Sequence, residues 1–229
     1  MADALRSLLA PRAYADGTAV VLGLGRFGSA VALELAADGH DVLGIDADPA
    51  VVQAHNGLLT HVVRADVTDE VAMRELSVHE ADHVVVAVGS DLAGSVLATS
   101  LMIRFGVPSL WAKANDARHE AILEQLGVRH VVHPERDTGR RVAHLMHNAV
   151  EDFVEVAPGF AVVRTHAARE HLGLDLAAAG LAADDGVRVM AIRVGDRWVH
   201  PRPTHVLSAE DELLVSGPTR QVEAYGARR

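Results

Sequence analysis

The 229-residue sequence contains no cysteine and only one lysine, Lys113. The lack of cysteine excludes a disulfide framework, a thiolate metal site and a cysteine nucleophile. Aromatic residues make up 3% of the chain and hydrophobic residues 49%, so we expect cores built mainly of aliphatic side chains. The sequence also has no uninterrupted apolar run near the roughly 20 residues that a membrane-spanning helix needs.

Positive charge is scarce as well. The formal net charge is −10, and no run of Lys or Arg exceeds two residues. Because nucleic-acid binding depends on clustered cations that neutralise phosphates, we do not expect a nucleic acid as the partner. Residues 1–17 include charged side chains and Pro11 and lack the apolar segment of a signal peptide. We therefore interpret them as an N-terminal extension.

From Thr18 to Pro134, short apolar segments alternate with segments of helical pattern. Strands that are apolar at nearly every position are typically buried on both faces, and this description fits TAVVLGL, DVLGID, LTHVVRAD, HVVVAVG, SLWAKA and HVVHP. Helices are expected between them, over residues 27–37, 49–55, 69–76, 91–105 and 117–126. The alternation predicts an α/β domain over residues 18–135, with a Rossmann-like, doubly wound parallel sheet.

The pattern changes after Pro134. Six apolar residues with helical spacing predict a crossover helix, assigned to residues 136–152, that covers either its own domain or a second subunit: Val142, Leu145, Met146, Ala149, Val150 and Phe153. Residues 153–229 then contain strand patterns at FAVVRT, GVRVMAIRV, RWVH and DELLVSG, with a tight turn at Gly195-Asp196 and a short helix after Pro218. Their βαββ-like order predicts a small α+β lobe.

The stretch VVLGLGRFGSA leads from the first predicted strand into Gly23-x-Gly25-x-x-Gly28. Gly23 permits the tight turn, Gly25 lets the backbone approach a phosphate, and Gly28 lets helix and strand pack closely. The helix N-terminus presents free N–H groups to an anion. Asp46 follows 18 residues after Gly28, near the usual offset of an acid that binds ribose hydroxyls. This arrangement predicts a nucleotide site; the alternative is a glycine-rich turn required only for packing.

Further candidate residues follow the ends of the predicted strands. Asp48 and Asp46 together would repel a 2′-phosphate and so disfavour NADP, although Asp48 could equally cap the next helix. Asp66 ends the third strand beside the expected adenine position, or caps the helix after it. Small residues at the end of the fourth strand would let a ligand lie against the backbone: Ala87, Val88 and Gly89.

Catalytic groups are not recognisable in the sequence. A dehydrogenase of this type needs a proton donor near the nicotinamide, but no Tyr-x-x-x-Lys occurs, and the histidines show no HExxH or comparable metal spacing. We therefore predict a protein that is not an enzyme. The alternatives are an NAD-dependent oxidoreductase and a stand-alone sensor of nucleotides or cyclic di-AMP.

Several motifs occur in a family-specific order: GLGRFG, DVLGIDAD, RADVTD, AVGSD, WAKAND and HPERDTGRRVAHLM. They resemble the RCK or KTN domain of the regulatory subunits of Trk/Ktr-type potassium transporters, and the tail from Gly186 to Gly217 is similar to the C-terminal lobe of that family. The resemblance implies a cytoplasmic protein held at the inner face of the membrane by a potassium channel or transporter. It also implies homodimers, joined through a crossover helix at Gly139 to Asn148, that assemble into a homo-octameric ring.

The resemblance also implies ligands. ATP and ADP, or NADH and NAD, would bind the first domain, with Arg26 reaching the γ-phosphate of ATP in a neighbouring subunit and Glu135 near a Mg²⁺ or Ca²⁺ ion. Some members bind cyclic di-AMP between C-terminal lobes, where Ile192, His200 and Pro201 are candidates and ordinary strand packing is the alternative. The full set of expected nucleotide-binding residues is Gly23, Gly25, Arg26, Phe27, Gly28, Asp46, Asp48, Asp66, Val67, Ala87, Val88, Gly89, Lys113 and Glu135.

Overall fold

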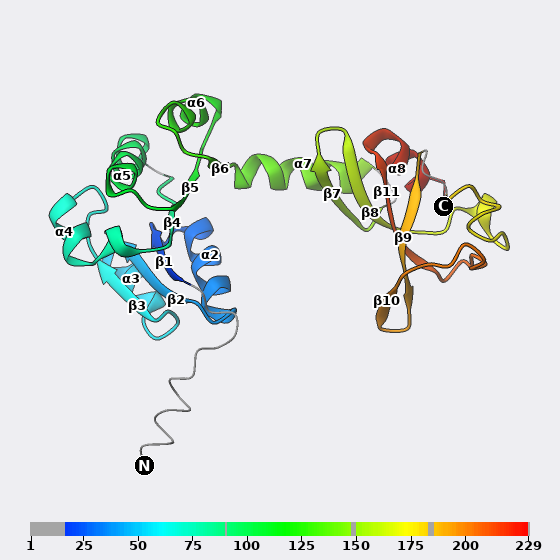
Figure 1. The fold of residues 1–229 in the computed structure, drawn as a ribbon, viewed down its shortest axis with the longest axis horizontal. Coiled ribbons are helices and arrows are strands. Elements are labelled where there is room, and N and C mark those ends of the chain that lie inside the picture. Colours follow the sequence, from blue (N-terminus) through cyan, green and yellow to red (C-terminus); the bar gives the residue numbers. More distant parts are fainter. Residues whose placement is uncertain (1–16, 90, 148–149, 183–185, 229) are drawn as a thin grey trace, which may run out of the picture. The chain divides into compact units, whose positions relative to one another are not determined.

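The computed structural model describes residues 17–89, 91–147, 150–182 and 186–228. The chain divides into two compact units, residues 1–135 and 136–229 (Figure 1). The predicted fold class is confirmed, because the first unit contains a parallel Rossmann-like sheet and the second a separate antiparallel sheet. Apart from Gly17, the predicted N-terminal extension lies outside the described residues. Within the described residues, none of the helices is both long and apolar enough to cross a membrane.

The sheet of the first unit has six parallel strands in the order β3-β2-β1-β4-β5-β6. The strand order reverses between β1 and β4, so a crevice is expected at the carboxyl ends of these two strands. The strands are β1 (Thr18–Leu22), β2 (Asp41–Asp46), β3 (His61–Arg64), β4 (His83–Val86), β5 (Ser109–Lys113) and β6 (His130–Val132).

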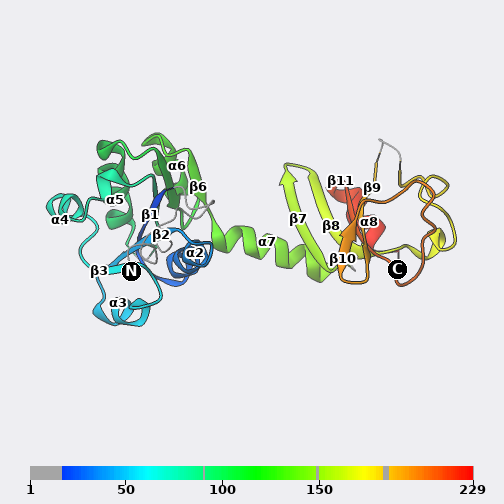
Figure 2. The same cartoon turned by 60° about the horizontal axis from the view of Figure 1, so that its bottom comes forward.

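Helices cover both faces of this sheet (Figure 2). Alternate residues of β1 explain the two layers, because Val21 packs with α2 and α3 on one face while Leu22 packs with α4, α5 and α6 on the other. Both side chains are fully buried, as the continuous apolar strands predict. The helical segments are α2 (Arg26–Ala37), α3 (Pro49–His55), α4 (Glu70–Glu75), η1 (Val78–Glu80), α5 (Leu92–Phe105) and α6 (Ala117–Gln125).

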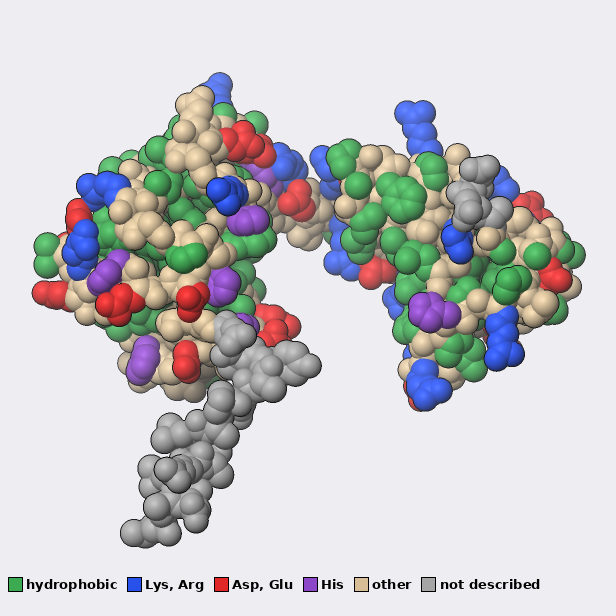
Figure 3. All heavy atoms as spheres, in the orientation of Figure 1, with side chains coloured by type: hydrophobic (Ala, Val, Ile, Leu, Met, Phe, Trp, Pro, Cys, Tyr) green, Lys and Arg blue, Asp and Glu red, His purple; other side chains and the backbone are tan. Residues whose placement is uncertain are grey.

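The second unit is built on a five-stranded antiparallel sheet in the order β10-β9-β11-β8-β7. Its core includes Phe153, Ile192 and Leu213 from the sheet and Val222 from the last helix. Figure 3 shows acidic, basic and hydrophobic side chains interspersed on the drawn faces of both units. The elements after β6 are α7 (Pro134–His147), β7 (Asp152–Ala157), β8 (Phe160–His166), η2 (Arg169–His171), β9 (Arg188–Val194), β10 (Arg197–Val199), β11 (Glu212–Pro218) and α8 (Thr219–Gly226).

The predicted helical stripe is wrong at its C-terminal end. Phe153, the last residue of the predicted stripe, lies in β7 and pairs with Val163 of β8. The lobe therefore begins with a β-hairpin and does not have the predicted βαββ order. The pairing of β7 with β8 determines the conformation of Phe153, and its helical spacing from the earlier apolar residues is coincidental. Within the stripe, Ala149 lies outside the described residues.

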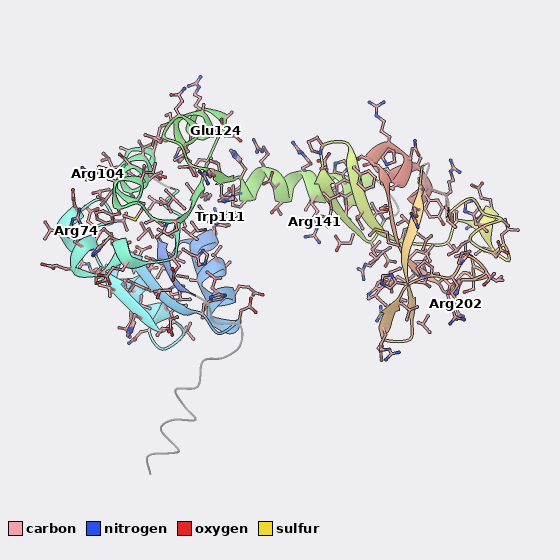
Figure 4. All side chains as sticks on the ribbon, in the orientation of Figure 1. Arg74, Arg104, Trp111, Glu124, Arg141 and Arg202 are labelled. Atoms are coloured by element: carbon pink, nitrogen blue, oxygen red, sulfur yellow. The ribbon has the colours of Figure 1, made fainter. Side chains whose placement is uncertain are left out.

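Helix α7 makes several contacts with its own second unit. Arg141, labelled in Figure 4, donates hydrogen bonds to Asp152 Oδ1 at 2.7 and 3.1 Å, and His144 stacks on Phe153 with ring centroids 4.0 Å apart. Leu145 packs against the core of the same unit, to which buried Val150 also belongs. The burial of Val150 and the partial burial of Leu145 therefore do not require a second subunit.

Candidate nucleotide-binding site

A cleft of about 810 Å³ lies in the first unit at the carboxyl ends of strands β1 to β5. This is the crevice expected where the strand order reverses. Apart from Gly28 and Asp48, every residue of the predicted set lines it: Gly23, Gly25, Arg26, Phe27, Asp46, Asp66, Val67, Ala87, Val88, Gly89, Lys113 and Glu135. The fold thus brings together side chains that are more than one hundred positions apart in the sequence.

Glycine serves a different structural purpose at each of the three loop positions. Gly23 has a φ of +92°, a region that other residues rarely adopt. A Cβ atom on Gly28 would lie 1.9 Å from the Gly23 carbonyl oxygen, whereas one on Gly25 would meet nothing within 4 Å. Gly28 therefore serves the packing of α2 on β1, while Gly25 keeps open space at the cleft.

The N-terminus of α2 has no side-chain cap. Its N-cap residue is Gly25, and its first turn contains no acidic side chain. The helices α3, α4 and α6 differ, because each is capped by the carboxylate of an aspartate, namely Asp48, Asp69 and Asp116. The first N–H groups of α2 and the positive end of its dipole thus remain available to an anion in the cleft. Arg26, the exposed first residue of α2, adds a full positive charge there.

The carboxylate of Asp46 forms hydrogen bonds with the backbone of the glycine loop and of the segment after β2. Its Oδ2 accepts a hydrogen bond of 2.7 Å from the Leu24 N–H, and its Oδ1 accepts one of 2.9 Å from the Asp48 N–H. A carboxylate has about four acceptor positions, so Asp46 retains acceptor capacity for ribose hydroxyls. The residue therefore shapes the loop in addition to any contact with a ligand.

The structure shows which of the two aspartates, Asp48 or Asp66, caps a helix. Asp48 Oδ1 accepts from the Ala50 N–H at 2.8 Å and caps α3, which is the alternative considered for it. The helix-cap alternative for Asp66 is wrong, because Asp69 caps α4. Asp66 Oδ1 instead accepts from the backbone N–H and the hydroxyl of Thr68, at 2.9 and 2.7 Å. These hydrogen bonds lower the pKa of Asp66, so it stays ionised at the rim of the cleft.

Lys113 and Glu135 form an ion pair at the cleft. Lys113 Nζ lies 2.7 Å from Glu135 Oε1, and their side chains are 12% and 60% exposed. The hydrogen bond from Lys113 is the largest cause of the lowered pKa of Glu135, and the charge of Arg26 lowers it further. A Cβ atom on Gly89 would lie 3.2 Å from Lys113 Nζ, so the glycine lets the ammonium group approach the backbone after β4.

A divalent cation at Glu135 would find few protein ligands. Across the described residues, no group of three or more His, Cys, Asp or Glu side chains is placed to hold a metal ion. Mg²⁺ commonly binds through one or two carboxylates together with phosphates and water. A cation bound at Glu135 would therefore need most of its ligands from a phosphate group and water, with Glu135 as its single protein ligand.

Several residues of the cleft were missed by the sequence analysis. They are Ala47, Ala65, Thr68, Asp91, Ala93, Gly94, Leu97 and Asn115. Most directly follow a predicted strand or belong to the first turns of α5, so their position after strand ends was the available signal. Asn115 donates a hydrogen bond to the Gly89 carbonyl oxygen and thereby joins the ends of β4 and β5.

The residues considered for cyclic di-AMP lie in the second unit. Ile192 is fully buried in the core, so ordinary packing explains it. His200 and Pro201 follow β10 and are exposed and half-buried, respectively.

The fold and the cleft define a two-unit protein with a Rossmann-like first domain, and known proteins share this organisation. Residues 19–134 match the TrkA-N domain. The chain is 33% identical over 210 residues to Ktr system potassium uptake protein C of Bacillus subtilis (strain 168), covering 91% of this chain and 95% of that protein. It is 33% identical over 205 residues to Ktr system potassium uptake protein A of Vibrio alginolyticus, covering 89% and 93%.

A solved structure supports the fold of the chain. The crystal structure of the GsuK RCK domain superimposes with a TM-score of 0.63 at 14% identity, covering 94% of this chain and 48% of that one. The chain thus spans about half the length of that GsuK chain. The chain belongs to the TrkA-N family that includes the Ktr system potassium uptake proteins, which confirms the resemblance seen in its motifs.

Proposed function

We propose that this chain is a nucleotide-sensing regulatory subunit that sets the activity of a membrane potassium channel or transporter. The names of the Ktr relatives support a role in potassium uptake. The observation that carries the proposal is the uncapped N-terminus of α2, which lines the same cleft as the cations of Arg26 and Lys113. Such a site suits a ligand with several phosphates, because helix dipole and cations both favour negative charge there.

ATP and ADP are the proposed ligands, with NADH and NAD as the alternative pair. The set of fourteen predicted residues is the proposed site, in which Gly28 and Asp48 act through the packing of α2 and the cap of α3. Arg26 would meet the terminal phosphate, where ATP and ADP differ. If Arg26 contacts ATP but not ADP, the two nucleotides stabilise two states of the protein to different extents. Such a difference in affinity is the requirement for a switch. In this proposal the chain gates a partner and catalyses no reaction.

The proposed cation site consists of Glu135 together with the nucleotide phosphates, occupied by Mg²⁺ or Ca²⁺. A cation that binds Glu135 shares the carboxylate with Lys113, and its positive charge weakens the attraction between Lys113 and Glu135. Lys113 would then be free to pair with a phosphate oxygen. The family resemblance also proposes a cyclic di-AMP site in the second unit, with His200 and Pro201 as its candidate residues.

Assembly is proposed to proceed through α7 and to yield homodimers and then an octameric ring at the cytoplasmic face of the membrane, held there by the channel. Two residues of the apolar stripe support a role of this helix in association, because Val142 is 46% exposed and Met146 is 81% exposed. Apolar side chains exposed on one helix face are typical of a contact surface.

Mass spectrometry of the protein purified without added ligand tests the proposal directly. We expect co-purified ATP or ADP under native conditions. In cells that lack their own potassium uptake systems, co-expression of the chain with its channel partner should restore growth at low potassium. A protein that carries no nucleotide and binds none in titration, and that does not alter potassium uptake, would contradict the proposed function.

A further inference from the structure

The second unit contains a cleft of its own, with a volume of about 420 Å³. It lies between one face of α8 and the turn that contains Gly180, and His171 of η2 also lines it. Its volume falls within the range of small-molecule sites. None of the residues considered above for nucleotides, cations or cyclic di-AMP lines this cleft.

Two arginines and a small residue form the α8 side of the cleft. Arg220 and Ala224 lie four residues apart in α8, Arg228 follows in the turn after the helix ends at Gly226, and all three line the cleft. Residues four apart lie on the same face of a helix, so Arg220 and Ala224 share the face of α8 that lines the cleft, and Arg228 borders the cleft from the following turn. Ala224 and Gly180, which also line the cleft, contribute little side-chain volume to it.

The arginines can accept a new partner at low cost. Within the described part of the chain, Arg220 makes no ion pair, and it is exposed. Arg228 Nη1 lies 2.8 Å from Glu170 Oε1, but both side chains are more than half exposed. Exposed ion pairs contribute little to stability, so an anion can take over Arg228 with little loss.

The inner wall of the cleft is aromatic. Tyr225 is nearly fully buried, and its ring lies 5.7 Å from that of His171 at an angle of 25°. The Nδ1 atom of His171 is buried and has no hydrogen-bond partner among the described residues. A buried polar atom without a partner is costly unless water or a ligand satisfies it.

From this geometry we propose that the cleft binds a small organic anion. Its phosphate or carboxylate group lies between Arg220 and Arg228, and its body covers Ala224 and approaches the His171 and Tyr225 rings. The formal charge of the chain is −10, so an anion is repelled by most of the molecule. A cleft with two arginines offers it a local positive potential. This ligand is separate from the proposed nucleotide, and its binding does not depend on the first unit.

Calorimetric titration of the full chain, saturated beforehand with ADP, tests this site. The two probes are glucose 6-phosphate for the phosphate arm and citrate for the carboxylate arm, with glucose as the neutral comparison. We expect at least one anionic probe to bind with a Kd of about 1 mM or lower, and glucose not to bind. The arm that binds identifies the anionic group.

Variants locate the binding. The double variant Arg220→Ala/Arg228→Ala should weaken the binding of the anionic probe at least tenfold. The matched control Arg197→Ala/Arg202→Ala removes two exposed arginines of the same unit that do not line the cleft and should leave it unchanged; Arg202 is labelled in Figure 4. Circular dichroism verifies that both variants are folded. If the parent binds neither anion, or if both double variants bind equally well, the proposal is wrong. Separate ADP titrations decide the nucleotide proposal.

Discussion

Lys113 Nζ lies 2.7 Å from Glu135 Oε1, and this contact joins the end of β5 to the first turn of α7. Both residues line the cleft in which the nucleotide is proposed to bind. A ligand that pairs with Lys113, or a cation that binds Glu135, therefore changes the charge balance at a contact made by the helix that leads out of the first unit. This ion pair is a physical link between the contents of the cleft and α7.

The titration of Glu135 should depend on Lys113. Because the hydrogen bond from Lys113 lowers the pKa of Glu135 below its ordinary value of 4.5, the pair contributes stability above about pH 4.5 and loses it as the pH falls through the lower, folded-state pKa. We expect the Glu135 pKa to rise in Lys113→Met, as measured by carboxyl-carbon NMR, while the pKa of Asp66 stays unchanged as an internal control. An unaltered Glu135 pKa would show that the contact is absent in solution.

The glycines of the loop should separate folding from binding. Gly28→Ala forces a methyl group against the Gly23 carbonyl oxygen and should lower the free energy of unfolding by about 1–3 kcal/mol or more. Gly25→Ala adds a methyl group in open space, so its stability should change by about 1 kcal/mol or less, while nucleotide affinity falls. Denaturant unfolding and calorimetry measure the two effects. Loss of stability in Gly25→Ala together with unchanged affinity would contradict the assigned roles.

Asp46→Ala should weaken ATP, ADP and NADH together. Loss of charge-assisted hydrogen bonds to ribose would cost about 1–3 kcal/mol, and the loop would also lose the acceptor of the Leu24 and Asp48 N–H groups. Asp46→Asn keeps one acceptor oxygen and serves as the milder comparison. If Asp46→Ala leaves the affinity for every nucleotide intact, Asp46 only shapes the loop.

Two neighbouring positions on α7 should behave differently. Met146→Asp changes an exposed side chain and should yield a folded but smaller assembly in light scattering, because an unpaired charge in an apolar interface is costly. Leu145→Asp instead places a charge against the core of the second unit and should lower the midpoint of thermal unfolding. If Met146→Asp keeps the mass of the parent assembly, α7 does not form the subunit interface.

The sequence predicted the first unit well because each of its features is local. Apolar strands, glycine positions and acids at strand ends are readable within a few residues, and the parallel topology then brings them to one edge. The ion pair between Lys113 and Glu135 could not be predicted from the sequence. It forms because Val132 of β6, three residues before Glu135, pairs with Lys113 in the sheet. The C-terminal end of the predicted stripe was wrong because Phe153 satisfies helical spacing, whereas its pairing with Val163 of β8 places it in a strand. Similarly, two nearby aspartates, Asp66 and Asp69, could cap α4, and the structure shows that the helix begins after Asp69.

The affinities of Arg26→Ala for ATP and ADP, measured side by side with Mg²⁺ present, test the central claim most directly. The glycines and Asp46 hold the loop conformation, and among the described residues the Arg26 side chain makes no hydrogen bond to it. ADP binding should therefore largely survive, whereas ATP should lose about 1–3 kcal/mol with its partner for the third phosphate. Arg118→Ala, an exposed arginine of the same unit outside the cleft, is the matched control and should leave both affinities unchanged. A selective loss of ATP affinity in Arg26→Ala supports a switch that distinguishes the two nucleotides. An equal loss for both, or no loss for either, would contradict it.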